Sequence, residues 1–421
     1  MRTALEGKTM RDTSDQQFLA DFEAMSARGA TAGGGVERQA ASHGDRKARE
    51  WLTGVLEEMG AEVYFDEIGN QFGLFTFVEG APYCAVGSHL DSQPLGGRFD
   101  GAYGVLAGAH AAARVKRAVE EGSVVPKRNL IVVNWFNEEG SRFEPSMMGS
   151  AVYVGKLTLA EAMGATDVAG TSVASAITAA NWQPVVALPP IAAYAEIHVE
   201  QGKLLEKAGN TIGLVTATWG ARKFEVTVRG EQGHTGSTMM ADRKDALFGA
   251  SLIVTGVRFL ADEFPGGHLQ SSVSKMLIEP NSPVTIAREV SFNIDLRSPD
   301  SAVLDAAHRK LEALLADAAK TSDTSVDLHL MHSWELNPYP SPGVELARTV
   351  VEELGYPYQE ILTVAGHDST NLKDEVPTVM LFIPSVDGIS HNEAEYTNAQ
   401  DCVAGVHVLT KVAEKMVEGG I

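Results

Sequence analysis

Two polar segments that each follow an apolar, strand-like run constrain the fold of this chain more than any other feature. Residues 83–86 form one such run and lead to His89, and residues 130–136 form another and lead to the adjacent Glu138 and Glu139. The carboxyl ends of parallel strands meet at one edge of an open α/β sheet, and ligands bind at that edge. We therefore expect an α/β fold in which these side chains project together from one sheet edge.

These residue types predict a site for two divalent metal ions. His89 is expected to bind a metal, while Asp91, two residues later, orients its imidazole. Asp100 would bridge the two ions, and Glu139 would bind one of them. Glu138 then remains free to act as the general base that takes a proton from the bridging water. The alternative is that these are ordinary polar residues at strand ends. It accounts for any one of them, but it accounts poorly for all of them occurring together.

Size and composition are those of a globular protein. A chain of 421 residues suggests two domains, or one domain that carries an insertion. Hydrophobic residues make up 44% and charged residues 21%, which argues against disorder. The formal net charge of −21 disfavours nucleic acid and anionic membranes as partners. It leaves a small anionic substrate open, because a local cation can dominate a pocket.

The chain has two cysteines, Cys84 in a predicted buried strand and Cys402 in the predicted last helix. Neither a disulfide framework nor thiolate chemistry is expected, and a reducing compartment is favoured. Residues 1–17 are polar and mixed in charge, without the apolar core of a signal peptide, and no later stretch is a long uninterrupted apolar run. We expect a cytoplasmic protein.

Helical and strand periodicities alternate in the first part of the chain. The predicted elements are a helix at 45–58, strands at 62–65, 71–77 and 83–86, a helix at 101–121, a strand at 128–136, helices within 159–180 and a strand at 192–199. A helix at 344–354 and a strand at 378–382 resume the alternation near the end, which predicts a doubly wound mixed sheet. The glycines at 33–35 indicate a turn, because no Lys-Ser/Thr pair follows them.

The pattern changes in the middle of the chain. Residues 223–229, 269–278, 289–296 and 325–331 read as strands, and residues 242–261 and 301–319 read as helices. This β-α-β-β-α-β order is typical of a ferredoxin-like α+β domain. We therefore predict a catalytic domain of residues 1–212 and 332–421, with a domain of residues 213–331 inserted into it.

Two further histidines belong to distant segments. His198 lies at the end of the predicted strand 192–199, and His391 comes shortly after the predicted strand 378–382. A single histidine at a strand end is more often structural, but the same sheet edge would deliver both imidazoles to the predicted metal site.

With these motifs in place, the chain resembles the amidase/hydantoinase/carbamoylase branch of the M20 metallopeptidase clan, from roughly residue 18 to residue 416. This branch includes N-carbamoyl-L-amino-acid hydrolases, β-ureidopropionases and allantoate amidohydrolases. The motifs that carry the resemblance lie at 87–92, 96–101, 137–143, 198–202, 366–368 and 388–391. The resemblance implies that His89 and His198 hold one ion and that Glu139 and His391 hold the other, with Asp100 bridging. Peptidase relatives have a carboxylate at the position of His198, so this histidine points to the amidohydrolases.

The resemblance also implies roles for the inserted domain, as a lid that dimerises. His234 would reach the active site of the partner subunit and stabilise the oxyanion, and Arg297 would bind a substrate carboxylate. Gln201 and the backbone around Gly366 would complete the substrate pocket. The structural alternatives are a turn histidine for His234 and a salt-bridged arginine for Arg297.

One position departs from the branch. Val284 stands where relatives commonly have an asparagine that binds substrate. Asn281, three residues earlier, is a candidate replacement, although a shift of three positions in a loop is not equivalent. The hydrolytic centre is therefore better supported than the substrate.

The expected enzyme is a two-metal amidohydrolase that acts on carbon–nitrogen bonds other than peptide bonds, as a homodimer with shared sites. The leading substrate is an N-carbamoyl-L-amino acid, and a carboxylate on the substrate is expected. Hydrolysis of β-ureidopropionate, allantoate, an N-acyl amino acid or another small amide remains open, as does a non-catalytic small-molecule binder. Histidine and carboxylate ligands suit zinc, manganese, cobalt or nickel, so the ligands alone do not identify the metal.

Overall fold

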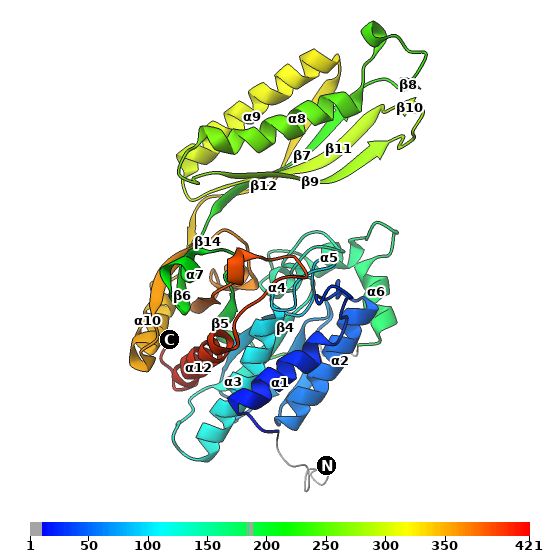
Figure 1. Cartoon of the computed structure of the whole chain (residues 1–421). Coiled ribbons are helices and arrows are strands. Elements are labelled where there is room, and N and C mark those ends of the chain that lie inside the picture. Colours follow the sequence, from blue (N-terminus) through cyan, green and yellow to red (C-terminus); the bar gives the residue numbers. More distant parts are fainter. Residues whose placement is uncertain (1–10, 183, 185–187) are drawn as a thin grey trace. The chain divides into compact units, whose positions relative to one another are not determined.

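The computed structural model describes residues 11–182, 184 and 188–421, so residues 1–10 of the segment considered for a targeting signal lie outside the described residues. The chain forms two compact units (Figure 1). The larger unit comprises Met1–Thr216, Tyr339–Ile361 and Gly366–Ile421, and the inserted unit comprises Ala217–Pro338 and Leu362–Ala365. The domain boundaries predicted after 212 and 331 differ from these, because they fall inside continuous strands that extend beyond the apolar runs.

A mixed sheet forms the centre of the larger unit. Its strands are β1 (Glu62–Phe65), β2 (Gln71–Phe75), β3 (Tyr83–His89), β4 (Asn129–Trp135), β5 (Ile191–Val199), β6 (Ile212–Thr218), β14 (Tyr358–Thr363) and β15 (Thr378–Ile383). They are ordered β1-β2-β4-β3-β5-β15-β6, and β14 also pairs with β6. The central strands β4, β3, β5 and β15 are parallel, so their carboxyl ends share one edge.

Helices cover both faces of this sheet, as a doubly wound fold requires. The helices of the larger unit are α1 (Asp15–Ser26), α2 (His43–Glu58), α3 (Ala102–Glu120), α4 (Met148–Tyr153), α5 (Leu159–Gly164), α6 (Val173–Ala180), α7 (Leu204–Ala208), α10 (Ser341–Leu354), α11 (Asp368–Leu372) and α12 (Ala399–Val417). Figure 1 shows α1, α2, α3 and α12 in front of the sheet. Helices α4 and α11 contact β4, β5 and β15 and pack into a separate core cluster. Helix α1 is not among the predicted elements, although Phe18, Phe22 and Met25 recur at helical spacing.

Successive side chains of a strand point to opposite faces of the sheet. The central strands are apolar throughout because helices cover both faces. In β3, Cys84 and Val86 belong to the core cluster with α1, α2, α3 and α12, whereas Tyr83 and Ala85 belong to the cluster on the opposite face. Both faces are buried, so polar side chains that need to reach a ligand stand at the strand ends. Cys84 and Cys402 are both buried, and neither forms a disulfide bond.

The inserted unit has the predicted β-α-β-β-α-β order. Its main elements are β7 (Gly220–Arg229), α8 (Ala246–Leu260), β9 (Gln270–Glu279), β11 (Glu289–Ser298), α9 (Ser301–Ser322) and β12 (Ser325–Trp334). The antiparallel sheet has the order β12-β7-β11-β9, and α8 and α9 pack on one face of it. The short strands β8 (Gly233–His234) and β10 (Thr285–Ile286) pair with each other, and β13 (Asn337–Pro338) pairs with the end of β6.

Helix α8 begins four residues later than predicted. Met240–Asp242 forms a separate 3-10 turn, and the Asp245 side chain then caps α8 by accepting the N–H groups of Leu247 and Phe248. The periodicity of residues 242–261 did not reveal this break, since both segments are compatible with a helix.

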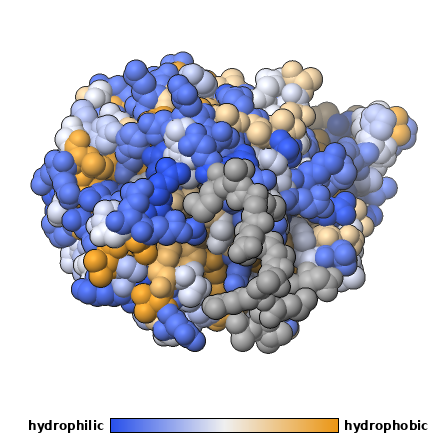
Figure 2. All heavy atoms as spheres, turned by 90° about the horizontal axis from the view of Figure 1, so that it is seen from below, coloured by the Kyte–Doolittle hydropathy of each residue, from blue (hydrophilic) through white to orange (hydrophobic). Residues whose placement is uncertain are grey.

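On the face drawn in Figure 2, hydrophilic residues predominate and hydrophobic side chains form small, separate areas. Within the described residues, every helix is too short or too polar to cross a lipid bilayer.

Candidate active site

The carboxyl edge of the central strands brings together the five residues predicted to bind metal. Two groups have ligand atoms within 4.8 Å of one another, the first formed by His89, Asp100 and His198 and the second by Asp100, Glu139 and His391. His89 is the last residue of β3, His198 is the penultimate residue of β5, and Glu139 follows β4. Segments far apart in the sequence therefore meet because parallel strands end at the same edge.

Asp100 belongs to both groups, and its two oxygens face different histidines. Its Oδ1 lies 3.0 Å from Nε2 of His198 and 3.7 Å from Nε2 of His89. Its Oδ2 lies 3.1 Å from Nε2 of His391, which in turn is 3.5 Å from Oε2 of Glu139. A carboxylate in this position can bridge two cations.

Backbone carbonyls orient two of the imidazoles. Nδ1 of His89 donates to the carbonyl of Asp91 (3.0 Å), and Nδ1 of His198 donates to the carbonyl of Val199 (2.9 Å). In the neutral rings these bonds place the hydrogen on Nδ1 and leave Nε2 as an acceptor, and Nε2 of His198 accepts the backbone N–H of Gly101 (2.9 Å). Gly101 is needed beside them, because a Cβ there would lie 2.3 Å from the His89 ring.

The carboxylate of Asp91 does not have the contact that was predicted for it. It lies 3.7 Å from Nδ1 of His89, and the backbone carbonyl of the same residue makes the hydrogen bond instead. The carboxylate accepts the backbone N–H groups of Glu138 (3.1 Å) and Glu139 (3.2 Å). Asp91 thus orients the imidazole through its backbone and holds the two glutamates through its side chain.

Glu138 stands beside the two groups without belonging to either. Its Oε2 lies 3.5 Å from Nε2 of His89, and the side chain is almost fully buried. Burial raises the pKa of the Glu138 carboxyl well above its usual range, and the carboxylate of Asp368 adds to the effect. A carboxyl group in such surroundings can hold a proton.

The electrostatics of the groups favour cations. Burial raises the pKa of Glu139 to about 8, and the nearby charge of Asp100 adds to the shift. Burial alone would lower the pKa of His198 and His391, yet hydrogen bonds to Asp100 raise each to about 9. Metal ions would displace such protons and neutralise the buried carboxylates.

Glu395 is a buried residue of this region that the sequence motifs did not single out. Its Oε1 accepts the backbone N–H groups of Phe99 and Asp100 (2.9 Å each), and its Oε2 accepts the Ser390 hydroxyl (2.9 Å). Glu395 therefore ties the loop of Asp100 to the loop of His391. A signal was present, since Glu395 lies four residues after His391 in a polar segment that follows an apolar strand.

Two of the predicted substrate residues also lie in the larger unit. Nε2 of Gln201 donates to Oδ2 of Asp100 (3.0 Å) and to Ser390 (3.0 Å), while its buried Oε1 has no hydrogen-bond partner among the described residues. Gly366 precedes the buried His367, whose ring centroid lies 4.6 Å from that of His198. Both positions are at the same sheet edge as the metal groups.

The inserted unit holds His234, Val284 and Asn281. His234 is exposed, and its Nδ1 accepts the N–H groups of Gly236 (3.0 Å) and Ser237 (3.3 Å). A neutral ring held in this way carries its hydrogen on Nε2, which is a donor suited to an oxyanion. Val284 and Asn281 are exposed in the loop between β9 and β10.

Arg297 has protein partners in this structure. Its Nε and Nη2 contact the carboxylate of Asp295, with Nη2 at 2.6 Å from Oδ2, and its Nη1 donates to the carbonyl of Val364 (2.8 Å). The predicted contact with a substrate carboxylate would therefore use the remaining N–H groups of a guanidinium that already has one carboxylate partner.

The donor chemistry suits divalent metal ions. Each group offers histidine nitrogens together with carboxylate oxygens, as zinc and related ions prefer, and Asp100 serves both groups. The unused carboxylate of Glu138 lies next to them. Such an arrangement is typical of metal-dependent hydrolases, and that is the class of protein that the fold and the site define.

Comparison with known proteins gives the family. The sequence matches the peptidase family M20/M25/M40 over residues 85–415. An N-carbamoyl-L-amino-acid amidohydrolase of Rhizobium meliloti is 33% identical over 96% of this chain and 97% of its own length. The chain belongs to the M20 family, in its amidase/hydantoinase/carbamoylase branch.

Further relatives agree with this assignment. A protein of Mycolicibacterium smegmatis, named in general terms as a hydrolase, is 51% identical over 97% of this chain and 94% of its own length. An allantoate amidohydrolase of Bacillus subtilis is 33% identical over 96% of this chain and 98% of its own length. A hydantoinase/carbamoylase family amidase from Burkholderia vietnamiensis has a TM-score of 0.90 and 33% identity, over 98% of this chain and 100% of that one. This protein is an amidohydrolase of a metal-dependent family and acts on carbon–nitrogen bonds other than peptide bonds.

Proposed function

We propose that the enzyme hydrolyses an N-carbamoyl-L-amino acid to the L-amino acid, ammonia and carbon dioxide. The observation that carries this proposal is Glu138, a buried carboxyl beside two donor groups that share Asp100. The full-length similarity to the Rhizobium N-carbamoyl-L-amino-acid amidohydrolase supports the substrate class. Two unpaired buried cysteines favour a reducing compartment.

His89 and His198 would hold one divalent ion, Glu139 and His391 would hold the other, and Asp100 would bridge them. When bound, the ions supply Lewis acidity and make water a stronger nucleophile at neutral pH. Zinc, manganese, cobalt and nickel all suit these ligands.

Glu138 would move the proton. Its carboxylate takes a proton from the attacking water while the oxygen adds to the carbamoyl carbon, and it then delivers that proton to the leaving nitrogen of the amino acid. The carbon–nitrogen bond breaks, and the carbamic acid product decomposes to ammonia and carbon dioxide. Nε2–H of His234 would stabilise the oxyanion that forms at the carbamoyl oxygen.

Allantoate hydrolysis is the second candidate, because the Bacillus allantoate amidohydrolase is as similar as the Rhizobium enzyme. β-Ureidopropionate, an N-acyl amino acid and a small amide remain further alternatives. Val284 is exposed and stands where relatives commonly have an asparagine. At this position the substrate pocket would differ from the pockets of those relatives. Gln201, Gly366 and Asn281 are the other proposed substrate residues.

A substrate screen with purified protein loaded with each metal tests the proposal, with ammonia and free amine scored separately. An N-carbamoyl amino acid should yield both products, β-ureidopropionate should yield ammonia and β-alanine, allantoate should yield ammonia and an amino-ureido acid that can release a second ammonia, and an N-acyl amino acid should yield only the amine. Saturable binding without turnover of any substrate would instead support a non-catalytic binder and reject hydrolysis.

Arg297→Ala is expected to reduce kcat/KM for a carboxylate substrate by roughly 10-fold to 100-fold, the effect of losing a charge-assisted pair. Arg297→Lys should recover only part of the loss, because an ammonium lacks the two-pronged geometry. The control is the same substrate with its carboxylate converted to an amide, which both variants should handle as the wild type does. An equal loss for acid and amide, with a lower melting temperature, would assign Arg297 only to its ion pair with Asp295.

The active unit is proposed to be a homodimer in which His234 serves the partner's site. Mixing inactive His234→Ala with inactive Glu138→Gln should then restore activity, because a heterodimer contains one site with neither change. Random exchange of subunits predicts about a quarter of the wild-type activity. Absence of recovery, with subunit exchange shown by mass spectrometry, would contradict a shared site.

A further inference from the structure

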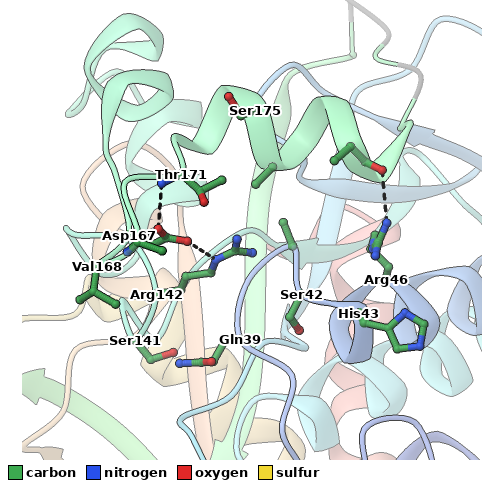
Figure 3. Close-up of a pocket in the computed structure, with 14 residues that line it drawn as sticks. Gln39, Ser42, His43, Arg46, Ser141, Arg142, Asp167, Val168, Thr171 and Ser175 are labelled. Carbon is green, nitrogen blue, oxygen red and sulfur yellow. Dashed lines mark hydrogen bonds and ion pairs between the residues drawn. The ribbon is translucent and has the colours of Figure 1, made fainter.

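The larger unit contains a cavity of about 510 Å³, which shares no lining residue with the metal groups or with Glu138. Sites for small molecules measure roughly 300–1,000 Å³. Its walls come from the start of α2, the segment that follows Glu139, the loop before α6, and α6 itself (Figure 3). The cavity is therefore large enough for a small ligand and lies outside the proposed catalytic machinery.

The charged side chains of the cavity leave a positive excess. Arg46 and Arg142 line it, and Asp167 is the acidic residue among the described lining residues. Asp167 is already satisfied, since it pairs with Nε of Arg142 (3.1 Å) and accepts the N–H groups of Ala169 (3.0 Å) and Thr171 (2.9 Å). In a chain with a net charge of −21, two arginines around one small cavity favour an anion.

Arg46 has a hydrogen-bond donor without a partner. Its Nη1 donates to the carbonyl of Ala179 at the end of α6 (3.2 Å). Its Nε is buried and has no hydrogen-bond partner among the described residues. Among the described residues the guanidinium of Arg46 makes the one hydrogen bond to Ala179, so it has N–H groups left for an oxygen atom of a ligand in the cavity. In the view of Figure 3, Arg46 and Arg142 both lie beneath the helix that carries Ser175.

The cavity is connected to the catalytic loop through the chain itself. Ser141 and Arg142 line it and follow Glu138 and Glu139 after a single residue, Gly140. The Ser141 hydroxyl donates to the carbonyl of Ser92 (3.0 Å), and Nη1 of Arg142 donates to the carbonyl of Ala40 (2.9 Å). A ligand that contacts Arg142 would therefore restrain the loop that positions the general base and one metal ligand.

We propose that this cavity binds a small oxyanion, a carboxylate or a phosphate, between Arg46 and Arg142. Ala41, Ala176 and Ala179 provide an apolar wall for the remainder of the ligand. The guanidinium groups supply charge-assisted hydrogen bonds, which suit both oxyanions. Occupancy would tune the rate through the 138–142 segment, in addition to the proposed hydrolysis and independently of its substrate.

Calorimetric titration of the metal-loaded enzyme with inorganic phosphate, and separately with benzoate, distinguishes the two oxyanions. Arg46→Gln should weaken binding of the preferred anion by roughly 10-fold or more, as expected for loss of a charge-assisted pair. Lys47→Gln is the matched control, because it removes the same charge from the next, exposed residue of α2 and should leave the affinity unchanged. Equal affinities in Arg46→Gln and the wild type would overturn the proposal.

Ser175→Trp gives an independent test, since it fills the cavity from an exposed position of α6 without a change of charge. It should abolish the same binding event while the melting temperature without anion stays unchanged. Crystals of the metal-loaded enzyme soaked in selenate, a tetrahedral oxyanion that can be located by anomalous scattering, should show selenate between Arg46 and Arg142. Selenate bound only at the metals, or absent from the cavity, would reject the site.

Discussion

Glu138→Gln is expected to lower kcat by roughly 10²-fold to 10⁴-fold, the usual contribution of a general base. Glutamine has the size of glutamate but cannot accept the proton of water. Oε2 of Glu138 faces His89, and the residue belongs to neither donor group, so the metal content should not change. Steady-state kinetics and metal analysis by mass spectrometry on the same sample measure both quantities.

Glu139→Gln is the matched control for this result, because it makes the same chemical change one residue away. Glu139 belongs to the group with Asp100 and His391, so this variant should lose metal as well as rate. Full activity of Glu138→Gln would remove the general-base assignment, and loss of metal in Glu138→Gln would make the residue a ligand.

Asp100→Asn is expected to lose metal from both groups and to reduce turnover to background. Its two oxygens face His198 and His391 separately, and asparagine keeps the size of the side chain but leaves one uncharged oxygen. The loss of metal affinity should exceed about 100-fold, the upper range for residues that only support a ligand. Titration with a competing chelator measures it.

Glu395→Gln is the comparison for Asp100→Asn, because a smaller loss of metal affinity is expected. Glu395 holds the backbone of Phe99 and Asp100 and does not belong to a donor group, so its replacement should weaken metal binding by roughly 10-fold to 100-fold. A melting temperature close to that of the wild type would show that the fold survives both changes. Stoichiometric metal and full turnover in Asp100→Asn would contradict the bridging role.

The positions of the proposed metal ligands could be expected from the sequence because their signal is local. An apolar run that stops at a histidine or an acidic pair indicates the end of a buried strand, and His89, His198 and Glu139 all have this context. The sequence signal for the order of strands and helices from Gly220 to Trp334 is equally local. It predicted the ferredoxin-like arrangement that the structure shows.

Contacts between distant segments could not be expected in the same way. The Asp91 carboxylate was assigned to the His89 ring on sequence proximity, but it binds the backbone of Glu138 and Glu139, more than forty positions away. Arg297 was assigned to a substrate carboxylate through the family resemblance, and its contact with Val364 depends on how β11 meets a later loop.

The sequence by itself therefore determined the class of fold, the kinds of side chain at the sheet edge and the chemistry open to them, because periodicity and residue type act over a few positions. Only the tertiary structure decided how those side chains are used. It placed the two oxygens of Asp100 toward different histidines, and it buried Glu395 against the loop of Asp100. It also placed Arg46 and Arg142 around one cavity, because cavities and hydrogen-bond partners depend on segments that approach one another only after the chain has folded.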